Sequence, residues 1–336
     1  MDYNYFYNEV MHHEWVLSNK LGGYSMGSGN LVNKRKYNGL LIASDNKFKR
    51  INLVSTQEEK VRWRTKEIYL DSNNYAECIY PDGYEHIVKT WLLPFPALLY
   101  SSVPKSDDFL ILKKIKLHPV KNIVKVSLSN LSSVKVEFTV RPKFSLRDHH
   151  GVNDINIWND LKPDVTIEEY FCSVERPDTN VKAFCAVSTG VIEKEEIIFR
   201  DIFYPLDSMR GYDASESLIS PVKWTFKLTP GETAEILYSD EKVMNFQKTA
   251  KEIDKRYSSH LLPVDHPDRI KTEYSLSKVN FSDDILFSNS KYSKLIGQIF
   301  DTFVTKDDII AGFPWFSAWG RDTMISMKAL LFEKNG

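Results

Sequence analysis

The chain has 336 residues, of which 42% are hydrophobic, 13% aromatic and 26% charged, and its formal net charge is −1. This length exceeds that of most single domains, so we expect one large domain and a smaller second one. The near-zero charge argues against a nucleic-acid partner or an anionic membrane, because both attract strongly basic surfaces.

The expected environment is the cytoplasm. Cys78, Cys172 and Cys185 are too few for a disulfide framework and too widely spaced for a metal knuckle. The first twenty residues lack the basic start and apolar core of a secretory signal. No apolar run approaches the roughly 18 to 20 residues of a membrane span. We therefore expect a cytoplasmic protein with no metal or other cofactor.

Strand patterns extend from about residue 10 to 240. Alternating apolar residues at 124–128 and 134–140, separated by polar residues, predict a hairpin. A second hairpin is predicted at 222–228 and 234–238, on either side of "TPGE". The whole pattern predicts a large antiparallel β-sandwich. Further strands are expected near 39–44, 51–54, 108–118 and 181–200.

Helical spacing replaces the strand pattern after Asp240. Apolar residues at helical spacing predict a surface helix over 246–257, a second helix over 295–303 and a third over 324–331. Asp322 or Thr323 is a suitable N-cap for the third helix. Because this last apolar stripe lacks partners in the remaining residues, we expect the second domain to be truncated.

The segment "PWFSAWGRD" is the strongest candidate for a functional site. It places Trp315, Phe316, Trp319, Arg321 and Asp322 within eight residues. Carbohydrate sites combine aromatic rings, which contact the C–H faces of a sugar, with charged groups that bind hydroxyls. The alternative is that the aromatic residues belong to a core and that the charged pair lies on the surface.

This segment resembles the aromatic signature of the glycogen debranching enzyme (amylo-α-1,6-glucosidase) family. Residues 14–44, with "LGGY" and "KYNGLL", resemble the amino-terminal signature of that family. Further resemblance, in the same order as in the family, occurs at 80–100, 141–151 and 203–221. One departure is Asn38, because the family pattern has histidine there.

The resemblance implies a fold and a function. The fold is a mainly β one, with a large antiparallel β-sandwich (supersandwich) at 1–262, a linker at 263–284 and the first helices of an (α/α)6 barrel at 285–336. The implied activity is hydrolysis of α-1,6-linked glucose at a trimmed branch of glycogen or a related α-glucan. That glucan is the expected partner.

The resemblance also implies roles for four residues. Trp315, Trp319 and Arg321 are expected to bind substrate. Asp322 is the candidate catalytic acid, although the neighbouring Arg321 favours its ionised form and therefore a binding role. Glycosidic cleavage needs a second carboxylate, and none is apparent nearby, so this chain alone is expected to be inactive.

Several other features have structural interpretations. "LGGYSMGSG" is expected to form a tight turn rather than a phosphate loop, because no "GK[ST]" follows. The adjacent histidines 149 and 150 are expected to point to opposite faces of a strand, and Arg147 to fix a loop. Arg210, with Asp207, Asp213 and Glu216, forms either a buried network or a solvated acidic turn.

Two other classes of function stay open. The chain could be a non-catalytic glycan-binding module that holds polysaccharide through its aromatic segment. It could also belong to a related enzyme of the same architecture, either a disaccharide phosphorylase or another exo-glucosidase. A phosphorylase would need a phosphate pocket of basic and small polar residues.

Overall fold

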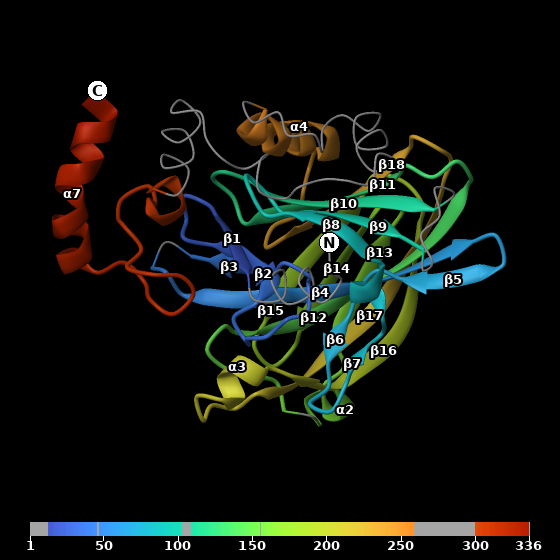
Figure 1. Cartoon of the computed structure of the whole chain (residues 1–336). Coiled ribbons are helices and arrows are strands. Elements are labelled where there is room, and N and C mark those ends of the chain that lie inside the picture. Colours follow the sequence, from blue (N-terminus) through green and yellow to red (C-terminus); the bar gives the residue numbers. More distant parts are fainter. Residues whose placement is uncertain (1–12, 46, 103–108, 155, 259–299, 336) are drawn as a thin grey trace.

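The computed structural model describes residues 13–45, 47–102, 109–154, 156–258 and 300–335. Its main feature is a pair of eight-stranded antiparallel sheets packed face to face and followed by helices (Figure 1). This arrangement confirms the predicted mainly β sandwich. A small ribbon is formed by β6 (Asn73–Asn74) and β7 (Ile79–Tyr80).

The first large sheet, sheet 1, has the strand order β1-β2-β3-β4-β12-β17-β16, with β5 paired to β4. Its strands are β1 (Glu14–Ser18), β2 (Tyr24–Ser28), β3 (Gly39–Ser44), β4 (Arg50–Trp63), β5 (Lys66–Tyr69), β12 (Val136–Asp148), β16 (Val191–Phe203) and β17 (Ser215–Leu228).

The second large sheet, sheet 2, has the order β13-β14-β15-β18-β11-β10-β9-β8. Its strands are β8 (Ile87–Trp91), β9 (Ala97–Ser101), β10 (Leu110–Leu117), β11 (Ile123–Asn130), β13 (Asp164–Glu168), β14 (Phe171–Arg176), β15 (Val181–Val187) and β18 (Thr233–Ser239). The helices are η1 (Gly83–His86, a 3-10 turn), α2 (Ile157–Asp160), α3 (Pro205–Ser208), α4 (Phe246–Tyr257) and α7 (Gly320–Asn335).

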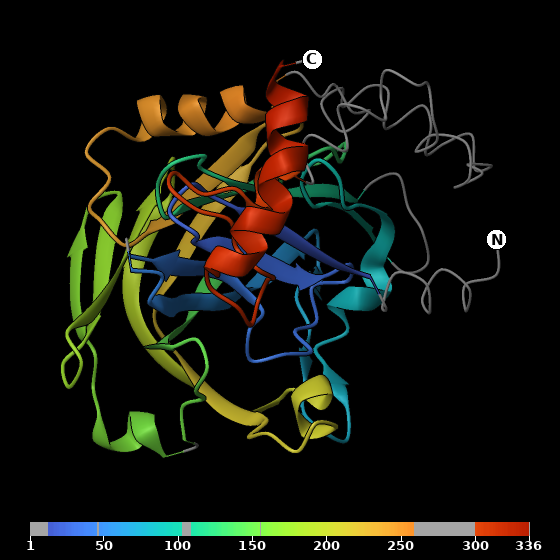
Figure 2. The same cartoon turned by 90° about the vertical axis from the view of Figure 1, so that its left-hand side faces the viewer.

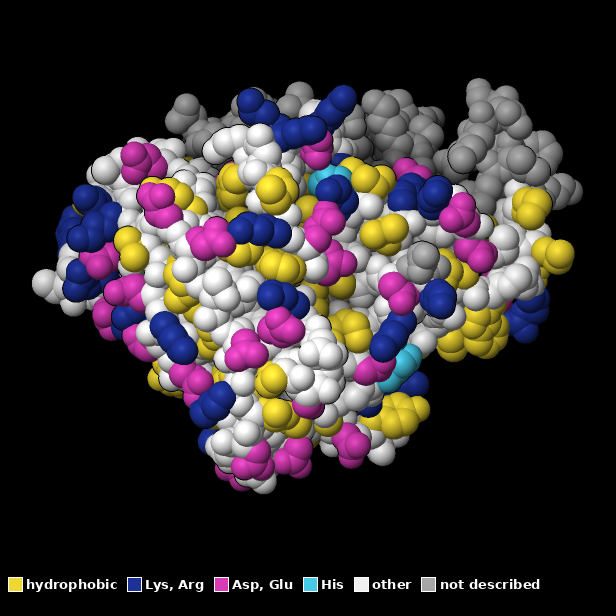
Figure 3. Space-filling view, turned by 180° about the vertical axis from the view of Figure 1, so that it is seen from behind, with side chains coloured by type: hydrophobic (Ala, Val, Ile, Leu, Met, Phe, Trp, Pro, Cys, Tyr) yellow, Lys and Arg dark blue, Asp and Glu magenta, His cyan; other side chains and the backbone are white. Residues whose placement is uncertain are grey.

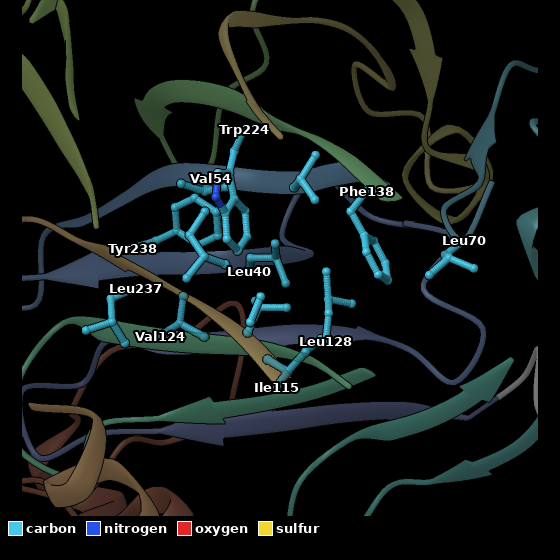
Figure 4. Close-up of a cluster of buried hydrophobic side chains, with 14 of the residues drawn as sticks. Leu40, Val54, Leu70, Ile115, Val124, Leu128, Phe138, Trp224, Leu237 and Tyr238 are labelled. Atoms are coloured by element: carbon cyan, nitrogen blue, oxygen red, sulfur yellow. The ribbon is translucent and has the colours of Figure 1, made fainter. Parts of the chain in front are cut away.

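One hydrophobic core fills the space between the two sheets (Figure 4). Phe138 and Phe226 are cross-strand partners on β12 and β17, and their rings stack with centroids 4.8 Å apart. Trp224 stacks on Phe226 at 4.1 Å. Burying one side chain of this size contributes about 1.5–3 kcal/mol. Burial of the apolar side chains that alternate along each strand and face inward therefore supplies most of the free energy that stabilises the packing of the two sheets.

Both predicted hairpins are wrong in their pairing, although all four strands form. β11 pairs with β10 and β18 in sheet 2, whereas β12 pairs with β4 and β17 in sheet 1. In the same way, β17 lies in sheet 1 and β18 in sheet 2. The two connections are arches that carry the chain from one sheet to the other. Alternating apolar residues predict which face of a strand is buried, but they do not predict which strand is its hydrogen-bonded neighbour.

Asn130, the last residue of β11, links the two arches. Its Nδ2 donates to the backbone oxygens of Val134, at 2.8 Å, and Leu228, at 3.0 Å. Its Oδ1 accepts from the Ser132 backbone N–H at 2.9 Å. Its own backbone bonds to Gly231 and Glu232 in the second arch. Both polar atoms of the Asn130 side chain and both of its backbone polar groups therefore have partners.

The helix predicted over 246–257 is confirmed as α4, which covers the outer face of sheet 2 (Figure 1). Asn245 caps its start by accepting from the Lys248 N–H at 2.9 Å. Asp254 on α4 accepts from Lys125 on β11 at 2.7 Å. This contact buries the outward-facing Lys125, a position that the alternating pattern alone would leave in solvent.

The carboxyl-terminal part is described only in part. The predicted linker, 263–284, and most of the predicted helix over 295–303 lie outside the described residues, of which 300–303 are helical. α7 begins at Gly320, so the predicted cap was placed too late, and Asp322 lies in the first turn. Met324 and Ile325 are 77% and 73% exposed. α7 stands beside one end of the sandwich (Figure 2).

Two observations concern the surface. On the face shown in Figure 3, acidic and basic side chains are interspersed with hydrophobic ones. In the described ranges, no helix combines the length and the apolar character needed to cross a membrane. The expected cytoplasmic location stays a prediction.

Candidate functional site

The aromatic segment, residues 311–319, folds back on itself at one end of the sandwich (Figures 1 and 2). The Ala311 N–H donates to Ser317 O at 3.0 Å, and the Phe316 N–H donates to Gly312 O at 2.9 Å. The residues before it dock on the turn between β1 and β2, where Lys306 N–H donates to Lys20 O at 2.9 Å. The segment is therefore a closed loop held against sheet 1.

The turn that receives it is the start of the predicted glycine-rich turn, which is only partly confirmed, because Tyr24–Ser28 form β2 instead of a turn. Gly22 adopts a φ of +83°, a conformation that other residues rarely adopt. Asn19 Oδ1 accepts from the backbone N–H groups of Leu21, at 2.9 Å, and Gly23, at 3.0 Å. The small residues thus serve a tight turn that presents the Gly22 carbonyl to a neighbouring strand.

Arg50, at the start of β4, anchors the aromatic segment. It is only 2% exposed, and its guanidinium donates to Gly22 O at 3.1 Å, Pro314 O at 3.2 Å and Phe316 O at 3.0 Å. It also lies 5.0 Å from the Phe313 ring and 5.5 Å from the Tyr24 ring. Burial lowers the pKa of Arg50. The carbonyls and rings supply the electron density that a paired carboxylate would otherwise provide.

Trp315 is held between two arginines of the sandwich. Arg35 lies 5.2 Å and Arg210 5.0 Å from its ring centroid. Arg210 is also 5.4 Å from the centroid of the Tyr212 ring, and Lys36 Nζ is 5.3 Å from the same centroid. Cations placed over aromatic faces attract them by about 0.5–1 kcal/mol each at exposed sites. We call this alternating series the cation–aromatic ladder: Lys36, Tyr212, Arg210, Trp315 and Arg35.

A buried polar network lies beneath the ladder. Arg147 donates through two nitrogens to Glu216, at 2.5 and 2.8 Å, and through Nη2 to Lys36 O at 2.8 Å. Tyr204 donates to the same carboxylate at 2.5 Å. Burial opposes the charge on Arg147, but Glu216 outweighs that cost and raises the pKa of Arg147. The predicted structural role of Arg147 is therefore supported by its contacts.

The segment 207–216 was expected to form either a buried network or a solvated acidic turn, and each description is correct for some of its residues. Asp207 is buried and accepts from the Lys36 backbone N–H at 2.7 Å, and Glu216 is buried against Arg147. Asp213 is exposed. Arg210 joins neither carboxylate and stacks in the ladder instead. The buried acids fix the backbone that presents Arg210 and Tyr212.

Asn38 is fully buried, and its side chain bonds to the neighbouring backbone. Its Oδ1 accepts from the backbone N–H groups of Lys34, at 2.9 Å, and Arg35, at 2.8 Å. It therefore shapes the turn that carries Arg35 and Tyr37, and the residue that replaces the family's histidine acts through the backbone.

The adjacent histidines depart from the prediction. They follow β12 in a turn, and their rings pack with centroids 3.9 Å apart rather than on opposite faces of a strand. His150 is exposed and contacts the Tyr37 hydroxyl at 3.2 Å through Nδ1. His149 is buried, and burial, followed by the charges of His150 and Arg50, lowers the pKa of His149 to about 3. No metal-binding group of side chains occurs within the described ranges.

Three of the four predicted site residues lie together at the start of α7. Trp319 is 45% exposed, and Arg321 lies 5.7 Å from the centroid of its ring. Arg321 Nη2 is 3.5 Å from Asp322 Oδ2, which accepts no hydrogen bond from the described residues. Phe316, also 45% exposed, meets Trp319 edge to face at 5.5 Å. Trp315, the fourth predicted residue, is partly buried in the ladder.

Two family models match the chain. The one described as Glycogen debranching enzyme N terminal matches residues 13–235, more than half of the chain. The one described as Amylo-alpha-1,6-glucosidase matches residues 287–335. The chain belongs to the glycogen debranching enzyme family. In this chain, Trp315 comes from the second matched region and the other four ladder residues come from the first.

Solved structures resemble the chain only distantly, and a search of curated proteins finds no match. A bacterial glucoamylase complexed with acarbose has 10% identity and a TM-score of 0.36, covering 86% of this chain and 40% of its own. A putative aldose 1-epimerase from Escherichia coli K12 has 12% identity and a TM-score of 0.35, covering 68% and 98%. A putative kojibiose phosphorylase from human microbiome has 8% identity and a TM-score of 0.35, covering 80% and 36%. The chain thus spans less than half of that glucoamylase.

Sequence reasoning missed the sandwich residues of the site. Arg35, Lys36 and Tyr37 lie within the stretch 14–44, which resembles the family, so that stretch was the available signal. Tyr212 lies within 203–221, which gave the same signal. Arg50 lies outside every such stretch, and a single arginine at the start of a strand has no pattern that marks it.

Proposed function

We propose that this chain is part of an amylo-α-1,6-glucosidase, which hydrolyses the α-1,6-linked glucose at branch points of glycogen or a related α-glucan. Family membership supports the activity. The observation that carries the assignment to a site is the grouping of Trp319, Arg321 and Asp322 on an exposed helix start beside the aromatic segment.

Each of these side chains suits a sugar. The Trp319 ring offers a flat apolar surface to the C–H face of a glucose unit. The largely exposed guanidinium of Arg321 offers several fixed donors to hydroxyl oxygens. The Asp322 side chain is 30% exposed, and its buried Oδ2 accepts no hydrogen bond from the described residues, so this carboxylate keeps an unused acceptor beside Arg321. Together they bind one glucose unit by stacking and by charge-assisted hydrogen bonds.

We assign Asp322 a binding role in preference to proton donation. Its carboxylate lies in the first turn of α7, where the helix dipole stabilises negative charge, and 3.5 Å from Arg321. An inverting glycosidase needs two carboxyl groups about 6.5–9.5 Å apart, one on each side of the bond. The proposal therefore gives Asp322 the task of orienting the glucose unit towards a catalytic pair.

Glucose release from a branched limit dextrin tests this proposal. The full-length protein should release free glucose, and Asp322→Asn should raise KM by about 10- to 100-fold, the effect of losing a charged hydrogen bond. A collapse of kcat with KM unchanged would instead identify Asp322 as a catalytic residue.

Other results would reject the proposal. No glucose from a folded full-length protein would contradict the activity. Glucan binding without any release would favour the glycan-binding module, and a requirement for phosphate, with glucose 1-phosphate as product, would favour a disaccharide phosphorylase.

A further inference from the structure

Tyr212 is an exposed aromatic side chain, and buried residues beneath it fix the position of its backbone. Its ring is 50% exposed. Its backbone N–H donates to Asp207 O at 3.0 Å, and the fully buried Asp207 carboxylate in turn accepts from the Lys36 N–H at 2.7 Å. Lys36 and Arg210 also lie over its ring, at 5.3 and 5.4 Å. The ring is therefore preorganised at the surface rather than carried on a loose loop.

Arg210 has donors to spare beside this ring. Its side chain is exposed and forms no ion pair with any residue in the described part of the chain. The neighbouring acids are engaged elsewhere, since Asp207 binds Lys36 and Glu216 binds Arg147. One guanidinium thus lies between two rings, Tyr212 and Trp315, with hydrogen-bond donors still available.

The same combination occurs in the proposed glucose site. There, Arg321 lies over the half-exposed ring of Trp319, and Phe316 packs edge to face against the same ring. Trp319, Phe316 and Trp315 all belong to the aromatic segment. Tyr212 and Arg210 repeat the pairing of a half-exposed ring with a guanidinium on a different part of the chain, and Arg210 also lies 5.0 Å from the Trp315 ring. A polymer of similar units fits this arrangement, because each pair of an aromatic ring and a guanidinium can bind one unit.

We propose that Tyr212 and Arg210 form a second sugar-binding position, supplied by the sandwich, for a more distant glucose unit of the α-glucan chain. This inference rests on the proposed function. In this proposal the sandwich favours longer glucans, because Tyr212 and Arg210 contact a glucose unit other than the one at Trp319. The position selects polymers over short sugars without taking part in bond cleavage.

Binding measurements on the full-length protein separate this role from a purely structural one. Tyr212→Ala should weaken binding of maltoheptaose by about 2- to 10-fold, the usual effect of one aromatic stacking contact, and should leave binding of glucose unchanged. Tyr212→Phe keeps the ring without its hydroxyl and should bind maltoheptaose within about twofold of the wild type. Circular dichroism and the melting temperature verify that both variants fold.

Two outcomes would overturn the inference. Unchanged maltoheptaose binding by a folded Tyr212→Ala variant would remove Tyr212 from the glucan surface. Equal losses for glucose and maltoheptaose would show that Tyr212 acts only by positioning Trp315. Neither result bears on glucose release by the wild type, so failure of this inference is distinguishable from failure of the proposed activity.

Discussion

His149 is a buried and uncharged imidazole at the end of the sandwich that receives the aromatic segment. It packs against Tyr37 and His150, and the charges around it are those of Arg50, Arg147 and Asp148. Burial, the first cause, lowers its pKa from 6.5 to about 3. In the unfolded chain the same group takes up a proton at ordinary histidine pH values.

The stability of the protein should therefore depend on pH through His149. Between about pH 6.5 and pH 3 the unfolded state binds a proton on His149 that the folded state does not. The titration of His149 therefore leaves the free energy of unfolding unchanged above pH 6.5 and decreases it as the pH falls through that window. The slope from this one group is at most about 1.4 kcal/mol per pH unit. Urea denaturation at pH 7, 5 and 4 should show a shallower decline for His149→Gln than for the wild type. Parallel declines would contradict the buried neutral state.

Arg50 shows why single residues of the site escape prediction. It joins Gly22 to Pro314 and Phe316, which lie far apart in the sequence. Before the fold is known, nothing distinguishes it from the many exposed arginines of a strand end, and arginine is rarely buried without a carboxylate partner. Its role follows from the convergence of three carbonyl oxygens, and that convergence is a property of the tertiary structure.

The arches show what element-level patterns do and do not determine. The alternating residues of β11, β12, β17 and β18 correctly predict four strands with buried faces. They also resemble hairpins, because a short polar turn separates each pair. The partners are set by the closure of the two sheets around a common core, since the inward faces of β11 and β12 pack across that core instead of side by side.

Asn130 should be a strong determinant of this crossing. Replacing it with alanine leaves the Val134 and Leu228 carbonyls and the Ser132 N–H without their partner. Each unsatisfied buried group costs about 1–3 kcal/mol, so Asn130→Ala should lower the free energy of unfolding by about 3 kcal/mol or more. Asn159→Ala, at an exposed position, should change it by less than about 0.5 kcal/mol. Similar small effects of both changes, measured by urea denaturation, would show that Asn130 does not hold the arches.

At the scale of the molecule, stretches widely separated in the sequence meet at one end of the sandwich. The turn after β1, the 34–38 turn, the loop after α3 and the aromatic segment all contribute to the ladder or to its anchor. The resemblance to the family identifies most of these stretches, but only the fold shows that they are neighbours. The aromatic segment was predicted as the site from its composition, whereas its support by Arg35, Arg50 and Arg210 required tertiary contacts.

The central claim is that the exposed start of α7 binds the glucose unit of an α-glucan. Calorimetric titration of the full-length protein with maltoheptaose tests it most directly, with Trp319→Ala compared with Tyr170→Ala. Tyr170 has a similar exposure, 48% against 45%, and lies in the turn between β13 and β14. We predict that Trp319→Ala weakens binding by about 10-fold, from lost stacking, while Tyr170→Ala binds as the wild type does. Wild-type affinity in a folded Trp319→Ala variant would contradict the claim.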